Sequence, residues 1–185
     1  MKTVHIVILF ILVALVQLAI PTQMIMNRES ILNNGQAFKF KTVPIDPSNP
    51  FKGKYISLNY ANERVKTSTL NLKRGQEIYI VFELDSLGFV QPTDAVIEAP
   101  STGYYVKAKA QYYDYDNKRM LYFNYPFDEF YMNENKAYEA EMAYREAQFD
   151  SLPNNAYALV YIKNGEAVLD NVFINDIPII EYIKE

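Results

Sequence analysis

A long apolar segment at the N-terminus constrains this chain more than any other feature of its sequence. Residues 4–20 are apolar except for His5 and Gln17, and apolar character resumes after Pro21. At about 1.5 Å per residue, a helix over residues 4–26 is long enough to cross the roughly 30 Å hydrocarbon layer of a bilayer. A cleaved secretory signal is the alternative, but no small-residue cleavage site of the A-x-A type follows this segment. The sequence therefore favours an uncleaved transmembrane anchor that contacts the lipid bilayer.

The rest of the chain is long enough for one folded domain. The sequence has 185 residues, 50% of them hydrophobic and 15% aromatic, which supplies a proper core rather than a disordered tail. We predict an N-terminal transmembrane signal-anchor over residues 1–28 and a β-rich domain over residues 29–185. A short linker between Met26 and Gln36 separates the apolar segment from the first predicted strand.

Charges at the two ends of the apolar segment indicate its orientation. Lys2 and the terminal amine flank one end, whereas Arg28 stands beside Glu29 at the other. Because positive charge concentrates on the cytoplasmic side of membrane helices, we expect a cytoplasmic N-terminus. The domain is then extracytoplasmic, on the periplasmic side of the inner cell membrane.

Two residues interrupt the apolar segment in a way that bears on partners. The amide of Gln17 can hydrogen-bond to a neighbouring membrane helix, and Pro21 can kink the segment where that neighbour packs. Gln17 is therefore a candidate contact to a membrane partner. The alternative is that Gln17 lies near the outer interface and that Pro21 is a tolerated irregularity of the helix.

Charge and composition exclude several classes of function. A formal net charge of −4 and an isoelectric point near 5.1 leave no basic surface for a nucleic-acid backbone, so no nucleic-acid partner is expected. The sequence has no cysteine, and its single histidine, His5, lies in the anchor. The domain therefore cannot build a thiolate zinc site, a thiol nucleophile or a histidine-based catalytic centre. We predict no metal, no cofactor and no catalytic residue set.

After the anchor, the periodicity is that of β-strands. Alternation of apolar and polar residues predicts strands at 36–43, 55–60 and 78–84. Two hairpins follow, and Asn164-Gly165 in the second is suited to a two-residue turn with positive φ. The hairpin strands are 104–113 with 119–125, and 156–163 with 166–174. About seven or eight strands joined by turns favour a mainly β fold, either an antiparallel β-sandwich or an open barrel.

One segment, residues 133–149, departs from the strand pattern. It is rich in Ala and Glu and predicts a surface helix of about four turns. Its mixed stripe consists of Tyr138, Met142, Arg145 and Phe149. A cover for one face or edge of a sheet is the favoured role of this helix, and docking of a partner is the alternative.

Three prolines make a rigid connector ahead of the second predicted strand. Pro44, Pro47 and Pro50 each fix φ and remove a backbone donor, so the connector cannot continue a sheet. Asp46 favours a turn through bonds from its side chain to the backbone, and Gly53 allows a close approach. We interpret the connector as architectural, because it delivers the chain into the next strand with a defined register.

Alternation also predicts which face of the strand at 55–60 is buried. Ile56, Leu58 and Tyr60 share one face, and Tyr55 lies on the other. We expect the first face to be buried and the hydroxyl of Tyr60 to reach a hydrogen-bond partner at the edge of the core.

The sequence "GKYISLNY" resembles the signature of a bacterial family, the GDYXXLXY proteins. Gly53, Tyr55, Leu58 and Tyr60 match the signature, and Lys54 stands where the signature has aspartate. Further stretches that resemble the family are 44–51, 130–135 and 162–176. With the anchor included, the resemblance covers nearly the whole chain, and we interpret the matching residues as structural. The reversed charge at Lys54 argues against a role that needs the acid, such as a cation ligand.

The resemblance implies a single membrane segment and a β-rich extracytoplasmic domain, in a family of envelope proteins without an assigned activity. Its members are often encoded beside a polytopic membrane protein. The favoured function is therefore a non-enzymatic accessory subunit or binding partner of such a membrane protein. The alternative is a membrane-tethered hydrolase or carbohydrate-active domain that uses carboxylates, with Glu134 as the first candidate.

Overall fold

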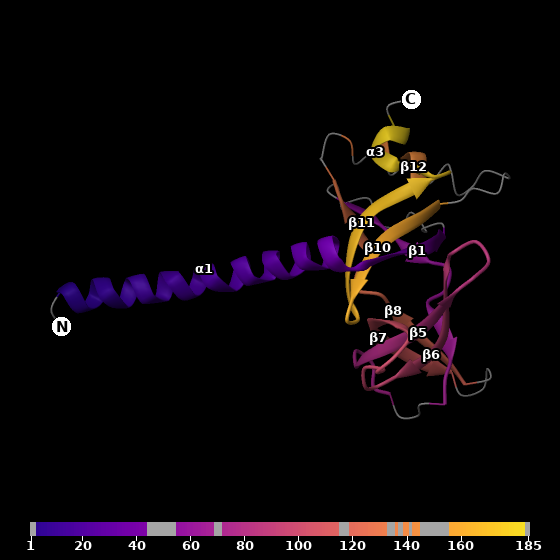
Figure 1. Ribbon diagram of the computed structural model, residues 1–185, viewed down its shortest axis with the longest axis horizontal. Coiled ribbons are helices and arrows are strands. Elements are labelled where there is room, and N and C mark those ends of the chain that lie inside the picture. The colour runs from indigo at the N-terminus through magenta and orange to yellow at the C-terminus, as the bar shows by residue number, and fades with distance from the viewer. Residues whose placement is uncertain are drawn as a thin grey trace.

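The computed structural model consists of one long helix and a β domain (Figure 1). The helix projects from one side of the domain, and the N-terminus lies at its far end. The structure describes residues 3–43, 55–68, 72–114, 119–132, 136, 139–140, 142–144 and 156–183.

Strands make up most of the described chain between the helices at its two ends. The helices at the two ends are α1 (Thr3–Asn34) and α3 (Ile179–Tyr182). The strands are β1 (Gln36–Val43), β2 (Tyr55–Ser57), β3 (Asn59–Tyr60), β4 (Arg64–Lys66), β5 (Glu77–Leu84), β6 (Val90–Val96), β7 (Tyr104–Asp114), β8 (Met120–Asn124), β9 (Glu129–Tyr131), β10 (Ala156–Lys163), β11 (Glu166–Ile174) and β12 (Ile177–Pro178).

Two five-stranded antiparallel sheets make up most of the domain. One has the order β12-β11-β10-β1-β3 and the other the order β4-β8-β7-β5-β6, while β2 and β9 form a separate ribbon. Isolated parallel bridges from Lys39 to Phe89 and from Val106 to Gly165 link the two sheets. The predicted mainly β, antiparallel fold is confirmed, and the sheets together approach a closed barrel.

Both predicted hairpins are present, and local turn chemistry accounts for the second of them. The pairs β7–β8 and β10–β11 are antiparallel, as predicted. Asn164 and Gly165 have φ values of 53° and 80°, and a type I′ turn requires positive φ at both of its central residues. Gly165 also lies against the ring of Tyr105, since an added Cβ would be 2.9 Å from it. The turn therefore fixes the register of β10 and β11 and keeps a close contact with the other sheet.

The helix α1 is long and apolar, and only its last turns contact the domain. Its 32 residues rise about 48 Å, and its most apolar window has a mean hydropathy of 2.7. Pro21 lies inside the helix, and none of the helix residues is buried. Among the described residues, this is the one helix long and apolar enough to cross a membrane, by length and composition. Its apolar surface calls for lipid or another protein around it.

No linker separates α1 from the sheet. The helix ends at Asn34 and β1 begins at Gln36, so the linker predicted between Met26 and Gln36 is wrong. Apolar periodicity ends near Met26, but the last turns of α1 pack against β10 and β11, and this tertiary contact extends the helix beyond the apolar segment.

The junction at Gly35 is tight on both sides. The N–H of Gly35 donates to the carbonyl of Ile31 at 2.8 Å, which completes the last helical turn. A Cβ on Gly35 would lie 2.4 Å from the Ile31 oxygen and 3.1 Å from the Ile162 oxygen on β10. One turn earlier, the Lys163 ammonium of β10 donates to the Ser30 hydroxyl at 2.9 Å. The helix is therefore fastened to the sheet by backbone and side-chain contacts.

The prediction of one continuous strand over 55–60 is wrong in one respect, because the structure has two strands, β2 and β3, separated by Leu58. The first part, β2, pairs with β9, whereas the second part, β3, pairs with the end of β1. The N–H of Leu58 donates to the carbonyl of Asp128 at 2.7 Å. The chain thus changes its partner at Leu58 while the alternation of its side chains continues.

Aromatic rings fill the core near this change of partner. Phe40 on β1 packs edge-on against Tyr125 and Phe127, with ring centroids 5.1 and 5.0 Å away. Tyr60 packs edge-on against the same Phe127 ring at 5.4 Å. Such pairs stabilise a fold by roughly 0.5–1.5 kcal/mol beyond their buried area. The cluster fixes the chain that leads into β9.

The described residues within 133–149 are helical, as predicted. They are residues 136, 139–140 and 142–144. Ala140 and Tyr144 are fully buried, whereas Met142 is half-buried. The helix therefore covers the domain through Ala140 and Tyr144, four residues apart, and Met142 is the member of the predicted stripe that the structure describes. The other members of that stripe, Tyr138, Arg145 and Phe149, lie outside the described residues.

Candidate functional site

The segment that contains β2 and β3 pairs with or hydrogen-bonds to each residue of β9 and to the two residues before it. The paired residues are Tyr55 with Tyr131, Ile56 with Phe130, and Ser57 with Glu129. Next, the N–H of Leu58 donates to the carbonyl of Asp128, and the hydroxyl of Tyr60 donates to the carbonyl of Phe127, both at 2.7 Å. Five consecutive residues of the second segment are therefore positioned by the segment that carries the signature.

The buried face predicted for this segment is confirmed. Ile56, Leu58 and Tyr60 are 1%, 2% and 4% exposed. The hydroxyl of Tyr60 finds the partner expected of it, since its bond to the Phe127 carbonyl is buried. Residue 58 thus clamps the chain that enters β9 through its backbone N–H, and Tyr60 clamps it through its side-chain hydroxyl, while the Leu58 side chain fills the core.

Tyr60→Phe should lower the free energy of unfolding by about 1 kcal/mol, because it deletes one buried hydrogen bond and keeps the ring. Tyr112→Phe is the matched control, since Tyr112 is 58% exposed, and it should leave stability unchanged. Chemical denaturation followed by tyrosine fluorescence measures both. Equal stability of Tyr60→Phe and the native protein would contradict the clamping role.

A carboxylate that the sequence did not single out, Glu63, lies beside this clamp. The pKa of Glu63 is raised to about 7, mainly by burial and then by the negative charge of Asp128, while the Tyr125 backbone N–H, which donates to the carboxylate, opposes the shift. Glu63 lies between β3 and β4, three residues after Tyr60, and nothing in its local pattern marks it as buried. Its environment comes from Tyr125 and Asp128, which are distant in the chain.

The tyrosines around Glu63 stay protonated at neutral pH. The pKa of Tyr60 lies well above its usual value, mainly because the side chain is buried. Electrostatic repulsion from Tyr144, Asp128 and Glu63 also contributes to this rise. Burial likewise raises the pKa of Tyr125, with a further contribution from Glu63. These hydroxyls can donate hydrogen bonds, but they cannot act as phenolate nucleophiles at neutral pH. Glu63 is the group here that can change its charge near pH 7.

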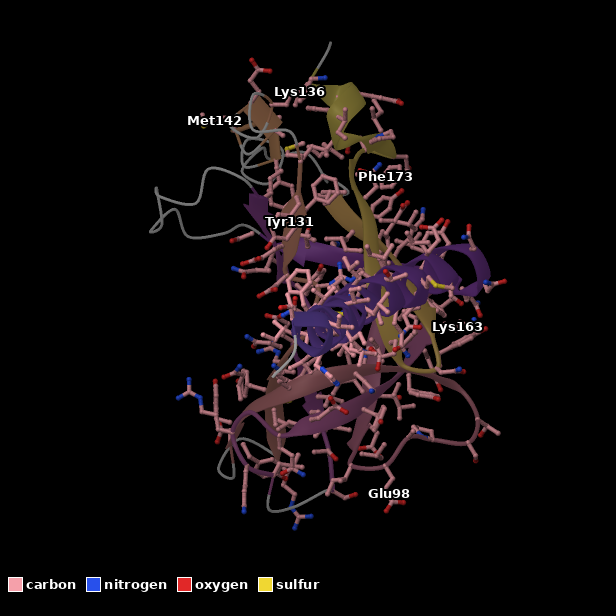
Figure 2. All side chains as sticks on the ribbon, turned by 90° about the vertical axis from the view of Figure 1, so that its left-hand side faces the viewer. Glu98, Tyr131, Lys136, Met142, Lys163 and Phe173 are labelled. Atoms are coloured by element: carbon pink, nitrogen blue, oxygen red, sulfur yellow. The ribbon has the colours of Figure 1, made fainter. Side chains whose placement is uncertain are left out.

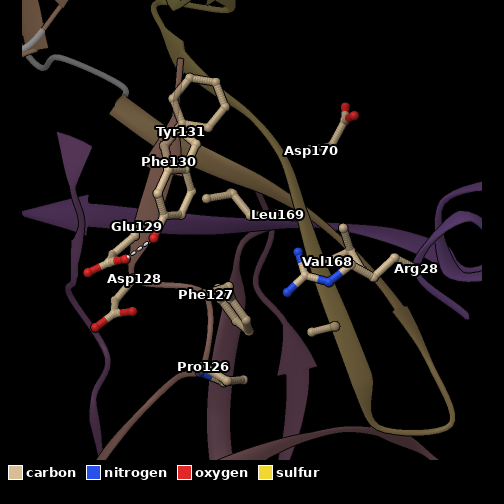
Figure 3. Close-up of a pocket in the computed structure, with 11 residues that line it drawn as sticks. Arg28, Pro126, Phe127, Asp128, Glu129, Phe130, Tyr131, Val168, Leu169 and Asp170 are labelled. Atoms are coloured by element: carbon tan, nitrogen blue, oxygen red, sulfur yellow. Dashed lines mark hydrogen bonds between the residues drawn. The ribbon is translucent and has the colours of Figure 1, made fainter. Parts of the chain in front are cut away.

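A cavity of about 400 Å³ opens between α1, β9 and β11, and one of its walls is the clamped segment (Figure 3). From α1 comes Arg28, whose side chain extends across β11 in Figure 3. The remaining lining residues are 126–131 and 167–170. Within the lining, the Tyr131 hydroxyl donates to the Glu129 carboxylate. We call this space the juxtamembrane cavity.

The structure brings only some of the predicted site residues together. Leu58 and Tyr60 meet the segment before β9, and Tyr55 pairs with it through the backbone. Gln17 is exposed on α1, about 27 Å along the helix axis from Gly35. Residues that fall outside the described part of the chain are Pro44, Asp46, Pro47, Pro50, Gly53 and Glu134. The described residues contain no group of three or more acidic or histidine side chains able to hold a metal ion.

One helix long and apolar enough to cross a membrane, running into an antiparallel β domain, is an architecture that fits a membrane-anchored β protein. The family model of the GDYXXLXY protein matches residues 17–172, a span that takes in half of α1 and nearly all of the strands. The chain belongs to this family. No curated protein and no solved structure matches it.

Proposed function

We propose that this membrane-anchored protein is a non-enzymatic accessory subunit, a binding partner of an integral membrane protein. The observation that supports this proposal most is the apolar part of α1, none of whose residues is buried by the rest of the chain. Lipid satisfies its apolar side chains, but a specific neighbour in the membrane would use polar and packing contacts instead. Gln17 supplies such a polar group on the exposed surface of α1.

The tight junction at Gly35 adds a second argument for a partner that contacts both parts. Because α1 and the sheet are fastened together, a neighbour that binds the helix also has the β domain beside it. Two weak contacts on one rigid body reinforce each other, since the first raises the effective concentration of the second. We place the N-terminus in the cytoplasm and the domain, over residues 29–185, on the periplasmic side of the inner membrane.

The test is retention of an integral membrane protein by full-length bait in mild detergent. We expect Gln17→Leu to weaken retention and leave membrane insertion unchanged, because one polar contact is lost while the apolar helix persists. Gln23→Leu, which changes the other glutamine of α1, is the matched control and should retain the partner. Resistance to alkaline extraction verifies insertion of each variant. Full retention by the domain on an unrelated anchor would show that α1 is only a tether.

A second candidate function, a membrane-tethered hydrolase or carbohydrate-active domain, is favoured by one observation. Glu63 and Asp128 are neighbouring carboxylates, and the pKa of Glu63, raised to about 7, suits a general acid. However, Glu63 does not line the juxtamembrane cavity, and Glu134 is outside the described residues. Hydrolysis of chromogenic glycosides or esters that Glu63→Gln abolishes would favour this candidate over the first.

A further inference from the structure

The juxtamembrane cavity lies at a defined depth relative to the predicted bilayer. The apolar segment ends at Met26, and Arg28 follows about 3 Å further along the helix axis. A bilayer of roughly 40–45 Å total thickness with a 30 Å core has headgroup layers of about 5–7 Å on each side. Arg28 therefore stands among lipid headgroups when α1 spans the membrane. Figure 2 views this side of the domain along α1, and Tyr131, another lining residue, is seen beside the helix.

The lining of the cavity carries both signs of charge. Arg28 supplies a guanidinium from α1, and it forms no ion pair with any described carboxylate. The domain supplies the carboxylates of Asp128, Glu129 and Asp170. The hydrogen bond to Glu129 raises the pKa of Tyr131, while the charge of Arg28 lowers it, so both signs act at one hydroxyl. The cavity thus suits a ligand that has an anionic and a cationic group of its own.

We propose that the juxtamembrane cavity binds the headgroup of a zwitterionic phospholipid with a primary ammonium, of the phosphatidylethanolamine type. The Arg28 guanidinium offers forked donors to the phosphate, which lies at the depth of this residue. The carboxylates of Asp128 and Glu129, which lie near each other in Figure 3, accept from the ammonium, which lies further from the hydrocarbon. The volume of about 400 Å³ is within the range of small-ligand sites.

This chemistry distinguishes ethanolamine from the other common headgroups. A primary ammonium has three N–H donors for the carboxylates, whereas the quaternary ammonium of choline has none. A glycerol headgroup carries no cation. The carboxylates on the domain side of the cavity therefore repel its phosphate, and no ammonium is present to offset this repulsion. The inference rests on the insertion of α1 into a bilayer, which is part of the proposed function, but it does not require a protein partner.

The experiment uses full-length protein in vesicles made from equal parts of phosphatidylcholine, phosphatidylethanolamine and phosphatidylglycerol. After extraction in mild detergent, mass spectrometry counts the lipids retained per protein. We expect phosphatidylethanolamine to be enriched about tenfold over phosphatidylcholine, the ratio that one charge-assisted hydrogen bond supports. Arg28→Gln should reduce retention of both, because the phosphate contact is lost. Asp128→Asn should reduce only the preference for phosphatidylethanolamine.

Two controls and two contrary outcomes complete the test. Arg64→Gln and Glu98→Gln change exposed residues outside the cavity and should behave as the native protein. Equal retention of the three lipids, or equal behaviour of Arg28→Gln and Arg64→Gln, would overturn the proposal. Thermal stabilisation of delipidated protein by soluble phosphoethanolamine, without lipid enrichment, would assign the cavity to a free phosphate ester instead. Alkaline extraction of the same vesicles separates these results from a failure of α1 to insert.

Discussion

Gly35→Ala should lower the free energy of unfolding by about 2–3 kcal/mol, the upper part of the range for overpacking a tight site. The added Cβ would lie 2.4 Å from the Ile31 oxygen and 3.1 Å from the Ile162 oxygen. Both neighbours are backbone atoms, so no side chain can rotate to make room. Either the last turn of α1 or the start of β1 must move, and the fastening of the helix to β10 is weakened.

Urea unfolding of the full-length protein in mild detergent, followed by tyrosine fluorescence, measures this loss. Asn34→Ala is the matched control, because it changes the preceding residue, which is exposed, and should stay within about 0.5 kcal/mol of the native protein. A second measurement addresses the junction itself. The distance distribution between spin labels on α1 and β10 should widen in Gly35→Ala. Native stability together with a native distance distribution would show that the junction tolerates a side chain.

Glu63 should make the protein less stable as the pH rises from about 4.5 to about 7. The pKa of Glu63 is about 7 in the folded chain, against its ordinary value of 4.5. In that window the folded state holds a proton that the unfolded state has released, so each rise in pH favours unfolding. Below the window both states are protonated and the penalty is absent. Above it the penalty is complete.

The size of this penalty follows from the shift. A shift of this size corresponds to about 3 kcal/mol at 1.36 kcal/mol per pH unit, and partial exposure of Glu63 to solvent reduces it to about 2 kcal/mol. Glu63→Gln should therefore match the native protein near pH 4.5 and exceed its stability by about 2 kcal/mol at pH 8. Glu98→Gln, at an exposed position, should show no such divergence. Parallel pH profiles of Glu63→Gln and the native protein would contradict burial of the charge.

Features encoded in adjacent residues could be predicted from the sequence. The turn at Asn164 and Gly165 needs only two residues that accept positive φ, and the alternation in β1 needs only its own eight residues. The apolar segment of α1 is equally local. In each case the physical cause lies within the segment itself, so pattern and outcome agree.

Features that depend on distant partners could not be predicted in this way. The break at Leu58 exists because its N–H donates to the carbonyl of Asp128, and no local property of Leu58 indicates that this distant residue is its partner. The buried environment of Glu63 is likewise made by chain about sixty residues away. The helical extension to Asn34 and the single turn α3 are stabilised by packing against strands rather than by periodicity. Of the candidate site, the clamp by Tyr60 was predictable, and the juxtamembrane cavity was not.

The direct passage from α1 into β1 at Gly35 means that, if α1 spans a bilayer as we propose, the length of α1 determines where the domain faces. In a helix each residue contributes about 1.5 Å of rise and about 100° of rotation. A residue inserted between the apolar segment and Gly35 would therefore lift the domain slightly but turn it by more than a quarter of a circle around the membrane normal. In that arrangement the β domain has a fixed rotation about the membrane normal as well as a fixed distance from the bilayer. Both are set by the number of residues between the apolar segment and Gly35.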